Sequence, residues 1–340
     1  MTHPYDCYLV DLDGTLYWGN IPIPHAVENI NALAGTIIYS TNNASRSPAE
    51  VAQKLTQMGF KALPENVLTS AQLGVQLLQE KVPPRAEILV VGAPYLQTLV
   101  EQAGYEVVER ETKATAAVIQ GHSPTTGWKE LSSAARAVRQ GALYIATNKD
   151  LSLPNEDGLN VGNGAMVGAV ELSTGTTALS AGKPSPRAFT QAITANKESN
   201  PLVIGDRLDT DIEGGVAAGY DTLCVLTGVA TVTDICNAPS SQRPSYVLLD
   251  LSELPQITQH NAVTKINEIS PSDISTALEV ASDSSGTVTV HFKKTDLPAS
   301  TEISLFIAWA WHNEVEVTTL KGRNNIDNKH LQQWRYSAEH

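Results

Sequence analysis

The sequence predicts an α/β protein with three parts: a doubly wound core on a parallel sheet, an inserted second α/β unit, and a small α+β domain at the end. Strand-like apolar runs alternate with helix-like segments up to about residue 257, as in parallel sheets covered by helices. The alternation breaks at Val82-Pro83-Pro84, and Gly182-Lys183-Pro184 marks its return. Beyond about Gln259, polar and apolar residues alternate as they do in antiparallel strands.

Composition limits the classes of function. The 340 residues suggest two or three compact units, and the 42% of hydrophobic residues allow a sizeable core. A formal net charge of −13 argues against nucleic acid or an anionic membrane as the main partner. The three cysteines lack metal-ligand spacing and are interpreted as reduced thiols. The sequence has no signal-peptide pattern, and no apolar run approaches the roughly 20 residues of a membrane span. We therefore expect a cytoplasmic location.

The first strand leads into the most informative stretch. The apolar run Cys7 to Val10 has the length of a buried strand, and Asp11, Asp13 and Gly14 follow it directly. Two carboxylates at a strand's end repel each other unless a cation lies between them, and Mg²⁺ prefers such hard oxygen ligands. Gly14 allows a sharp turn. Taken alone, the motif is more typical of a surface Asp-x-Asp-Gly turn than of a catalytic centre.

The first unit continues with helices and a strand. Residues 24–34 have the apolar spacing of a helix, and 36–40 form a second apolar strand. A helix follows from Pro48 to Met58, where Ser47 and Glu50 fit a capping box. A further helix fits residues 71–81, with Ser70 as its cap.

The remaining elements define the domains. The inserted unit is expected to contain strands over 88–91, 116–119 and 143–146 and helices over 95–103, 128–139 and 165–172. The core resumes with strands over 202–204, 222–226 and 246–249 and a helix over 212–218. In the last domain, 287–292 and 314–318 are predicted as antiparallel strands. The predicted domains are 1–81 with 180–258, then 82–179, then 262–340.

Other polar residues follow predicted strands or interrupt the alternation. Thr41 and Asn42 end the second strand, where the hydroxyl and nearby N–H groups could bind an oxyanion. Lys183 could place a fixed positive charge on a phosphoryl group, although most surface lysines are simply solvated. Asp206 directly follows a strand and suits Mg²⁺, and Asp211 suits a water-mediated contact. Asp211 also fits a helix N-terminus, where the dipole favours an acid.

Together these elements resemble the haloacid-dehalogenase superfamily of Mg²⁺-dependent phosphohydrolases. Their order is Asp-x-Asp-Gly-Thr, Thr-Asn, Gly-Lys-Pro and Gly-Asp-x-x-x-x-Asp, over residues 5–257. The position of the insertion resembles a C2 cap and the NagD-like (class IIA) branch. The extra C-terminal domain is most like that of the actinobacterial glycerol-3-phosphate phosphatases, where it resembles an acetyltransferase fold. No acyl-CoA loop is present in 262–340, so a dimerisation or packing module is expected.

The resemblance implies a role for each residue. Asp11 would be the nucleophile that forms an aspartyl-phosphate, and Asp13 the general acid and base. Thr41, the amide of Asn42 and Lys183 would stabilise the phosphoryl oxygens. The carboxylates of Asp11 and Asp206 and the carbonyl of Asp13 would hold Mg²⁺, with Asp211 in the second layer.

Substrate choice is expected to lie in the inserted unit. Asn148 and Asp150 match a Thr-Asn-x-Asp element of this branch and could contact the leaving group, although an Asx-type turn explains them equally well. The expected substrate is a small phosphorylated metabolite, with glycerol 3-phosphate favoured by domain architecture alone. Phosphoglycolate, pyridoxal phosphate and nucleoside monophosphates remain open. A non-catalytic binding protein is the alternative class, and a homodimer is expected without direct support.

Overall fold

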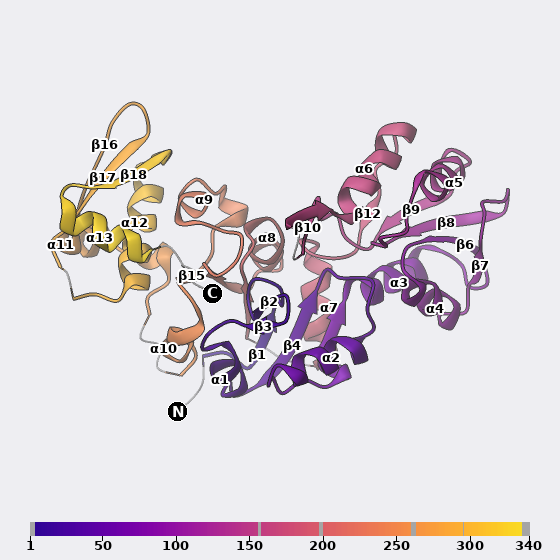
Figure 1. Cartoon of the computed structure of the whole chain (residues 1–340), viewed down its shortest axis with the longest axis horizontal. Helices are drawn as coiled ribbons and strands as arrows, with labels where there is room; N and C mark the ends of the chain where they lie inside the picture. The colour runs from indigo at the N-terminus through magenta and orange to yellow at the C-terminus, as the bar shows by residue number, and fades with distance from the viewer. Residues whose placement is uncertain (1–3, 156–157, 197–199, 260–262, 295, 335–340) are drawn as a thin grey trace. The chain divides into compact units, whose positions relative to one another are not determined.

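The computed structural model describes residues 4–155, 158–196, 200–259, 263–294 and 296–334 (Figure 1). Its contacts divide the chain into two compact units, residues 1–37 with 193–340 and residues 38–192. Strand β4 (Thr36–Thr41) and helix α7 (Pro186–Asn196) cross this division. The domain boundaries expected from the sequence are not tested by this division. One of them, residue 262, lies outside the described residues.

Four strands of the first unit pair in parallel, with β1 next to β13, β13 next to β14 and β14 next to β15. Because these strands run in the same direction, residues that directly follow them lie at one edge of the sheet. The elements are β1 (Cys7–Val10), β2 (Tyr17–Trp18), β3 (Ile21–Pro22), α1 (Ala26–Asn31), β13 (Pro201–Gly205), α8 (Glu213–Ala217), β14 (Asp221–Val225), α9 (Val232–Cys236), β15 (Tyr246–Leu248) and α10 (Leu254–Thr258).

Among its described residues, the C-terminal part of this unit adds a three-stranded sheet and three α-helices, in agreement with the predicted α+β domain. Its elements are α11 (Pro271–Ala277), β16 (Leu278–Ser282), β17 (Thr287–Phe292), α12 (Ala299–Asn313), β18 (Thr319–Gly322) and α13 (Asn325–Gln333). The strand predicted over 287–292 is confirmed as β17. The antiparallel strand predicted over 314–318 is wrong, because the last strand begins at Thr319 and pairs with β17 in parallel.

A contact distant in sequence explains this difference. Val317 is fully buried, its N–H donates to Asn237 Oδ1 at 2.8 Å, and its carbonyl accepts from Asn237 Nδ2 at 2.8 Å. These two bonds occupy the backbone groups that strand pairing would need. The alternation of Val315 and Val317 therefore reflects packing against the core instead of a sheet.

The C-terminal domain and the core of the first unit share one hydrophobic cluster. Buried side chains from β14, α9 and β15 pack in the same cluster as those of α11, β17 and α12. The Trp311 indole N–H also donates to the carbonyl of Ile235 at 3.0 Å. A shared apolar core of this kind is expected to stabilise both parts together.

One buried carboxyl in this domain predicts a pH effect on stability. Glu302 is 1% exposed within α12, and burial raises its pKa, although the Trp334 N–H at 3.3 Å and the His330 ring at 3.2 Å partly oppose that rise. The folded state binds this proton more tightly than the unfolded state does. Its contribution to stability is therefore complete below the ordinary pKa of a glutamate, and it is lost as pH rises through the pKa of the folded state. The free energy of unfolding of Glu302→Gln relative to wild type, measured in urea, should therefore increase from pH 5 to pH 8.

If the difference in stability between Glu302→Gln and wild type did not change with pH, Glu302 would not be the group responsible. The exposed carboxyl of Glu314 at the end of α12 offers a matched control, and Glu314→Gln should show no such pH dependence.

The second unit contains a five-stranded parallel sheet in the order β12, β9, β8, β6, β7. Helices α5 and α6 cover one of its faces and α3 and α4 the other (Figure 1). Its elements are α2 (Pro48–Gln57), β5 (Val67–Thr69), α3 (Ser70–Lys81), β6 (Glu87–Val91), α4 (Pro94–Gln102), β7 (Glu106–Val108), β8 (Thr115–Gln120), α5 (Trp128–Arg139), β9 (Leu143–Ala146), β10 (Ser152–Asn155), β11 (Gly158–Val161), α6 (Asn163–Thr174) and β12 (Leu179–Ser180).

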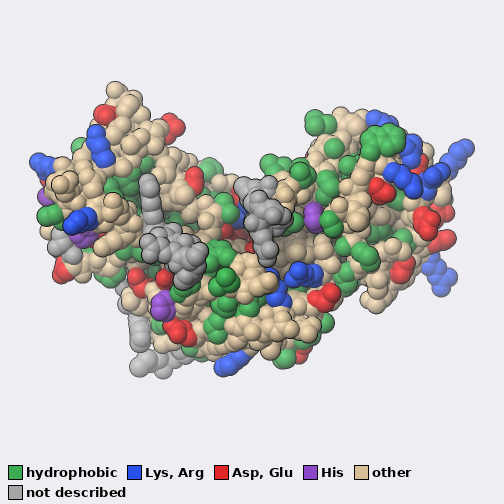
Figure 2. All heavy atoms as spheres, viewed as in Figure 1, with side chains coloured by type: hydrophobic (Ala, Val, Ile, Leu, Met, Phe, Trp, Pro, Cys, Tyr) green, Lys and Arg blue, Asp and Glu red, His purple; other side chains and the backbone are tan. Residues whose placement is uncertain are grey.

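The surface of the second unit carries both signs of charge. Figure 2 shows Lys and Arg side chains among Asp and Glu side chains at the end that holds α5 and β7. Arg136 and Glu111 form an ion pair there. The Arg136 guanidinium lowers the pKa of Glu111 to about 2, with a smaller contribution from Ser133. Within the described part of the chain, no helix has the length and apolar character needed to cross a bilayer.

Candidate active site

Three aspartates converge at the carboxyl edge of the first unit's sheet. Asp11 follows β1 and Asp206 follows β13, while Asp211 lies in a π-helical turn over Leu208–Ile212. One carboxylate oxygen from each lies within 4.8 Å of the others. Asp206 and Asp211 are each only 1% exposed. Three carboxylates this close repel one another unless a cation lies between them.

The donor set suits a hard divalent cation. All three side chains offer carboxylate oxygens, the ligands that Mg²⁺ and Ca²⁺ prefer. Glycines allow the backbone to approach closely, since an added Cβ at Gly14 or Gly228 would lie 2.5 or 1.9 Å from Asp206 Oδ2. Elsewhere in the described residues, no other three His, Cys, Asp or Glu side chains meet this spacing. The residues present therefore fit magnesium.

Hydrogen bonds fix the orientation of Asp206. The Val229 N–H donates to its Oδ2 at 2.8 Å, and the Thr15 hydroxyl donates to its Oδ1 at 3.3 Å. Asp13 differs, because its side chain is exposed and its Oδ2 accepts from the Tyr17 hydroxyl at 3.3 Å. An accessible carboxyl next to a buried acidic cluster suits proton transfer better than direct ligation.

A second group of predicted residues surrounds Asn42 in the second unit. The Asn42 side chain accepts from the Lys183 N–H at 2.9 Å and donates to the Lys183 carbonyl at 3.1 Å, which fixes that backbone from both sides. Lys183 is 3% exposed, and its Nζ donates to the carbonyl of Ser40 at 3.2 Å. Thr41 is buried, and its hydroxyl accepts from the Asn43 N–H at 3.1 Å. The lysine ammonium is thus held at the carboxyl end of β4.

Asn148 and Asp150 also contact Asn42. Asp150 Oδ1 accepts from Asn42 Nδ2 at 2.9 Å, and Asn148 Nδ2 donates to the Asn42 carbonyl at 2.7 Å. The structure therefore brings all five predicted residues of this unit together. The hydrogen bonds of Asn148 and Asp150 support a positioning role, and contact with the leaving group stays a proposal.

Sequence reasoning missed Ser70. We predicted it as the cap of α3, but Thr69 is the N-cap and forms a capping box with Gln72. The Ser70 hydroxyl instead donates to the Asn42 carbonyl at 2.6 Å. The signal was present, because Ser70 directly follows the short strand β5, which pairs in parallel with β4. Recognising β5 would have placed Ser70 beside Thr41.

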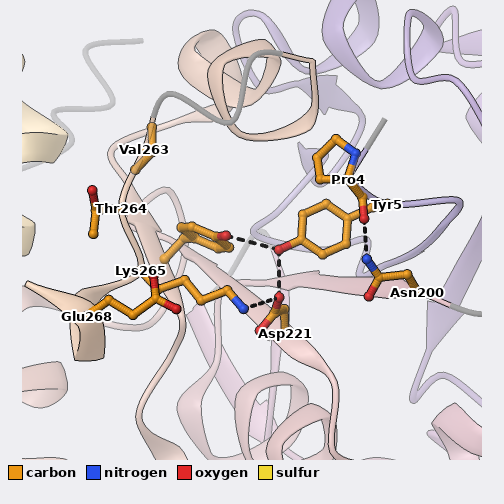
Figure 3. A pocket seen from close by; sticks show the side chains of 9 residues that line it. Pro4, Tyr5, Asn200, Asp221, Val263, Thr264, Lys265 and Glu268 are labelled. Atoms are coloured by element: carbon orange, nitrogen blue, oxygen red, sulfur yellow. Dashed lines mark hydrogen bonds and ion pairs between the residues drawn. The ribbon is translucent and has the colours of Figure 1, made fainter. Parts of the chain in front are cut away.

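A separate cavity of about 420 Å³ lies at the opposite, amino edge of the first unit's sheet (Figure 3). Asp221 accepts from the Tyr5 hydroxyl at 2.7 Å and pairs with Lys265 at 2.8 Å, and the hydroxyls of Tyr5 and Tyr246 are hydrogen-bonded at 3.1 Å. Burial is the main reason that the pKa of Tyr5 is raised, so the phenol stays a donor. These side chains bond to one another and anchor the segment that enters the C-terminal domain.

An acidic cluster at the carboxyl edge of a parallel sheet is typical of a metal-dependent hydrolase. The chain belongs to the haloacid dehalogenase-like hydrolase family, whose model matches residues 8–106, and a second HAD-hydrolase-like model matches 180–254. Relatives that are 45% and 36% identical to it are phosphatases, so the chain is a phosphoric monoester hydrolase.

Several characterised proteins are similar to this chain. The D-glycerol 3-phosphate phosphatase of Mycobacterium tuberculosis is 45% identical over 76% of this chain and 73% of its own length. An acid sugar phosphatase of Staphylococcus aureus is 36% identical over 73% of this chain and 96% of its own. A crystal structure of a Mycobacterium tuberculosis glycerol phosphate phosphatase with magnesium has a TM-score of 0.87 at 37% identity, and covers 98% of this chain and 99% of its own. That likeness therefore extends over the C-terminal domain.

Proposed function

We propose that this phosphatase hydrolyses glycerol 3-phosphate with Mg²⁺ as its cofactor. The assignment of Mg²⁺ is supported by the cluster of Asp11, Asp206 and Asp211, in which one carboxylate oxygen from each residue lies within 4.8 Å of the others. The substrate is supported by the 45% identity with a D-glycerol 3-phosphate phosphatase and by the match over the whole length of a magnesium-bound relative.

The proposed reaction has two steps. An Asp11 carboxylate oxygen attacks phosphorus, the bond to glycerol's oxygen breaks, and Asp13 gives its proton to the leaving alkoxide. Asp13 then takes a proton from a water molecule, which attacks the aspartyl-phosphate and releases inorganic phosphate. These roles split one difficult displacement into two easier ones.

Other residues of the chain bind and orient. Asp11, Asp206 and the carbonyl of Asp13 would hold Mg²⁺, with Asp211 acting through water. Bound Mg²⁺ supplies positive charge that offsets repulsion between the nucleophile and the anionic substrate. We propose that Lys183, Thr41 and the Asn42 amide bind the phosphoryl oxygens, and that Asn148 and Asp150 lie toward the leaving group. A cytoplasmic location and a homodimer stay predictions.

The test is phosphate release by the full chain from a panel of esters, with Mg²⁺ and after removal of metal by EDTA. We expect turnover with Mg²⁺, loss in EDTA and recovery on adding Mg²⁺ in excess. Glycerol 3-phosphate should give a kcat/KM at least about tenfold above the others, which equals about 1.4 kcal/mol of transition-state binding. The panel includes a hexose phosphate, phosphoglycolate, pyridoxal phosphate and a nucleoside monophosphate.

Each outcome has a distinct meaning. A hexose phosphate as the best substrate would favour the chemistry named for the Staphylococcus aureus relative and overturn glycerol 3-phosphate. Full activity in EDTA would overturn the role of Mg²⁺ and leave the substrate assignment in place.

A further inference from the structure

Thr227 lies where the loop after β14 meets the loop after β1. Its hydroxyl donates to the carbonyl of Gly14 at 2.6 Å, and its own carbonyl accepts from the Trp18 indole N–H at 2.9 Å. Thr227 is 5% exposed, so water does not readily replace either bond. One residue thus connects the Asp-x-Asp-Gly loop, the hairpin that follows it and the loop after β14.

The loop after β14 also contacts Asp206, the proposed metal ligand that follows β13. Two residues beyond Thr227, the Val229 N–H donates to Asp206 Oδ2 at 2.8 Å, and the next N–H, of Ala230, donates to the Asp206 carbonyl at 3.0 Å. Gly228, between Thr227 and Val229, packs so closely against Asp206 that an added Cβ would lie 1.9 Å from Asp206 Oδ2. A shift of Thr227 would therefore move groups that orient Asp206.

The bond to Gly14 matters because glycine does not fix its own conformation. Gly14 has a φ of +87°, in the region that only glycine adopts freely. Its N–H donates to the Tyr17 carbonyl at 3.0 Å, which also fixes the planar peptide that carries the Asp13 carbonyl. The Thr227 hydroxyl fixes the next peptide. Together the two bonds restrain both dihedral angles of Gly14 and the direction in which the Asp13 carbonyl points.

We propose that Thr227 is a positioning residue for the magnesium site, which holds the Asp13 carbonyl and Asp206 in the geometry that binds the ion. This inference rests on the proposed function and extends it to a residue outside the four motifs. Residues that orient metal ligands typically change metal affinity by about 10- to 100-fold when replaced. Mg²⁺ binding, measured without substrate, is thus the quantity that Thr227 should control.

The test compares Thr227→Val, which keeps the shape and removes the hydroxyl, with Thr227→Ser, which keeps the hydroxyl. Metal-free full-length protein is titrated with MgCl₂ by calorimetry, and the rise of Tm with added Mg²⁺ serves as a second readout. We expect Thr227→Val to bind Mg²⁺ about tenfold more weakly. Thr227→Ser should stay close to wild type, and the activity of Thr227→Val should recover at high Mg²⁺.

Thr222→Val is the matched control. Thr222 is fully buried in the same sheet, but its hydroxyl accepts from the Ser245 N–H at 3.2 Å, near the amino edge. Its Mg²⁺ affinity should equal that of wild type.

Two results would overturn the inference. Equal Mg²⁺ affinity of Thr227→Val and wild type would show that the hydroxyl does not position the site. Equal weakening in Thr227→Ser, which keeps the hydroxyl, and in Thr227→Val would show that the site responds to any change of packing at this position and not to loss of the hydroxyl. Because the readout is Mg²⁺ binding, failure of the proposed function is separate: it would appear as a wild type that binds Mg²⁺ but hydrolyses no ester.

Discussion

Replacing Asp11 with asparagine should lower phosphate release by a factor on the order of 10⁴ to 10⁶, because loss of a nucleophile removes the covalent route entirely. The amide has nearly the same shape as the carboxylate, so the fold should be retained. The measurement is steady-state turnover with saturating Mg²⁺, together with acid quenching of enzyme mixed with radiolabelled substrate. Wild type should retain a protein-bound phosphoryl group after the quench, and Asp11→Asn should not.

Asp209→Asn provides the control for Asp11. Asp209 belongs to the same acid-rich stretch as Asp206 and Asp211, but it is exposed and pairs with Arg207 at 2.8 Å. Its replacement should leave turnover near the wild-type value. Labelled protein in Asp11→Asn, or turnover within tenfold of wild type, would show that another group attacks phosphorus.

The acidic cluster was predictable because a simple topological rule governs it. Asp11 and Asp206 each follow a buried apolar run, and parallel strands deliver the residues after them to one edge of the sheet. Their proximity therefore follows from strand direction together with the pairing of β1 with β13. Asp211 fitted both a helix N-terminus and a contact near the metal, and the structure places it in the first turn of a π-helical segment and also in the acidic cluster.

The remaining features depend on contacts that local sequence does not encode. Thr227 follows a strand, yet its importance comes from Gly14, which lies 213 positions away in sequence. The segment 314–318 has strand-like alternation, but two bonds to Asn237 decide its conformation. Short strands such as β5 were missed because three residues carry too little periodicity.

Removal of the Lys183 ammonium should produce the second large loss of catalytic activity. Lys183→Met keeps most of the side-chain volume and removes the charge that is proposed to stabilise the phosphoryl oxygens. Loss of one such fixed donor typically lowers kcat by about 10²- to 10³-fold. The check is kcat and KM for glycerol 3-phosphate, with inhibition by orthovanadate as a measure of binding to a phosphoryl-like anion.

Lys149→Met separates this effect from a general loss of positive charge in the same unit. Lys149 pairs with Glu171 at 2.7 Å, and its side chain is 33% exposed. Its replacement should leave kcat nearly unchanged. Lys183→Met should bind Mg²⁺ as wild type does, because no proposed metal ligand is altered. If its Mg²⁺ affinity fell while vanadate inhibition stayed constant, Lys183 would act on the metal site instead of on the phosphoryl group.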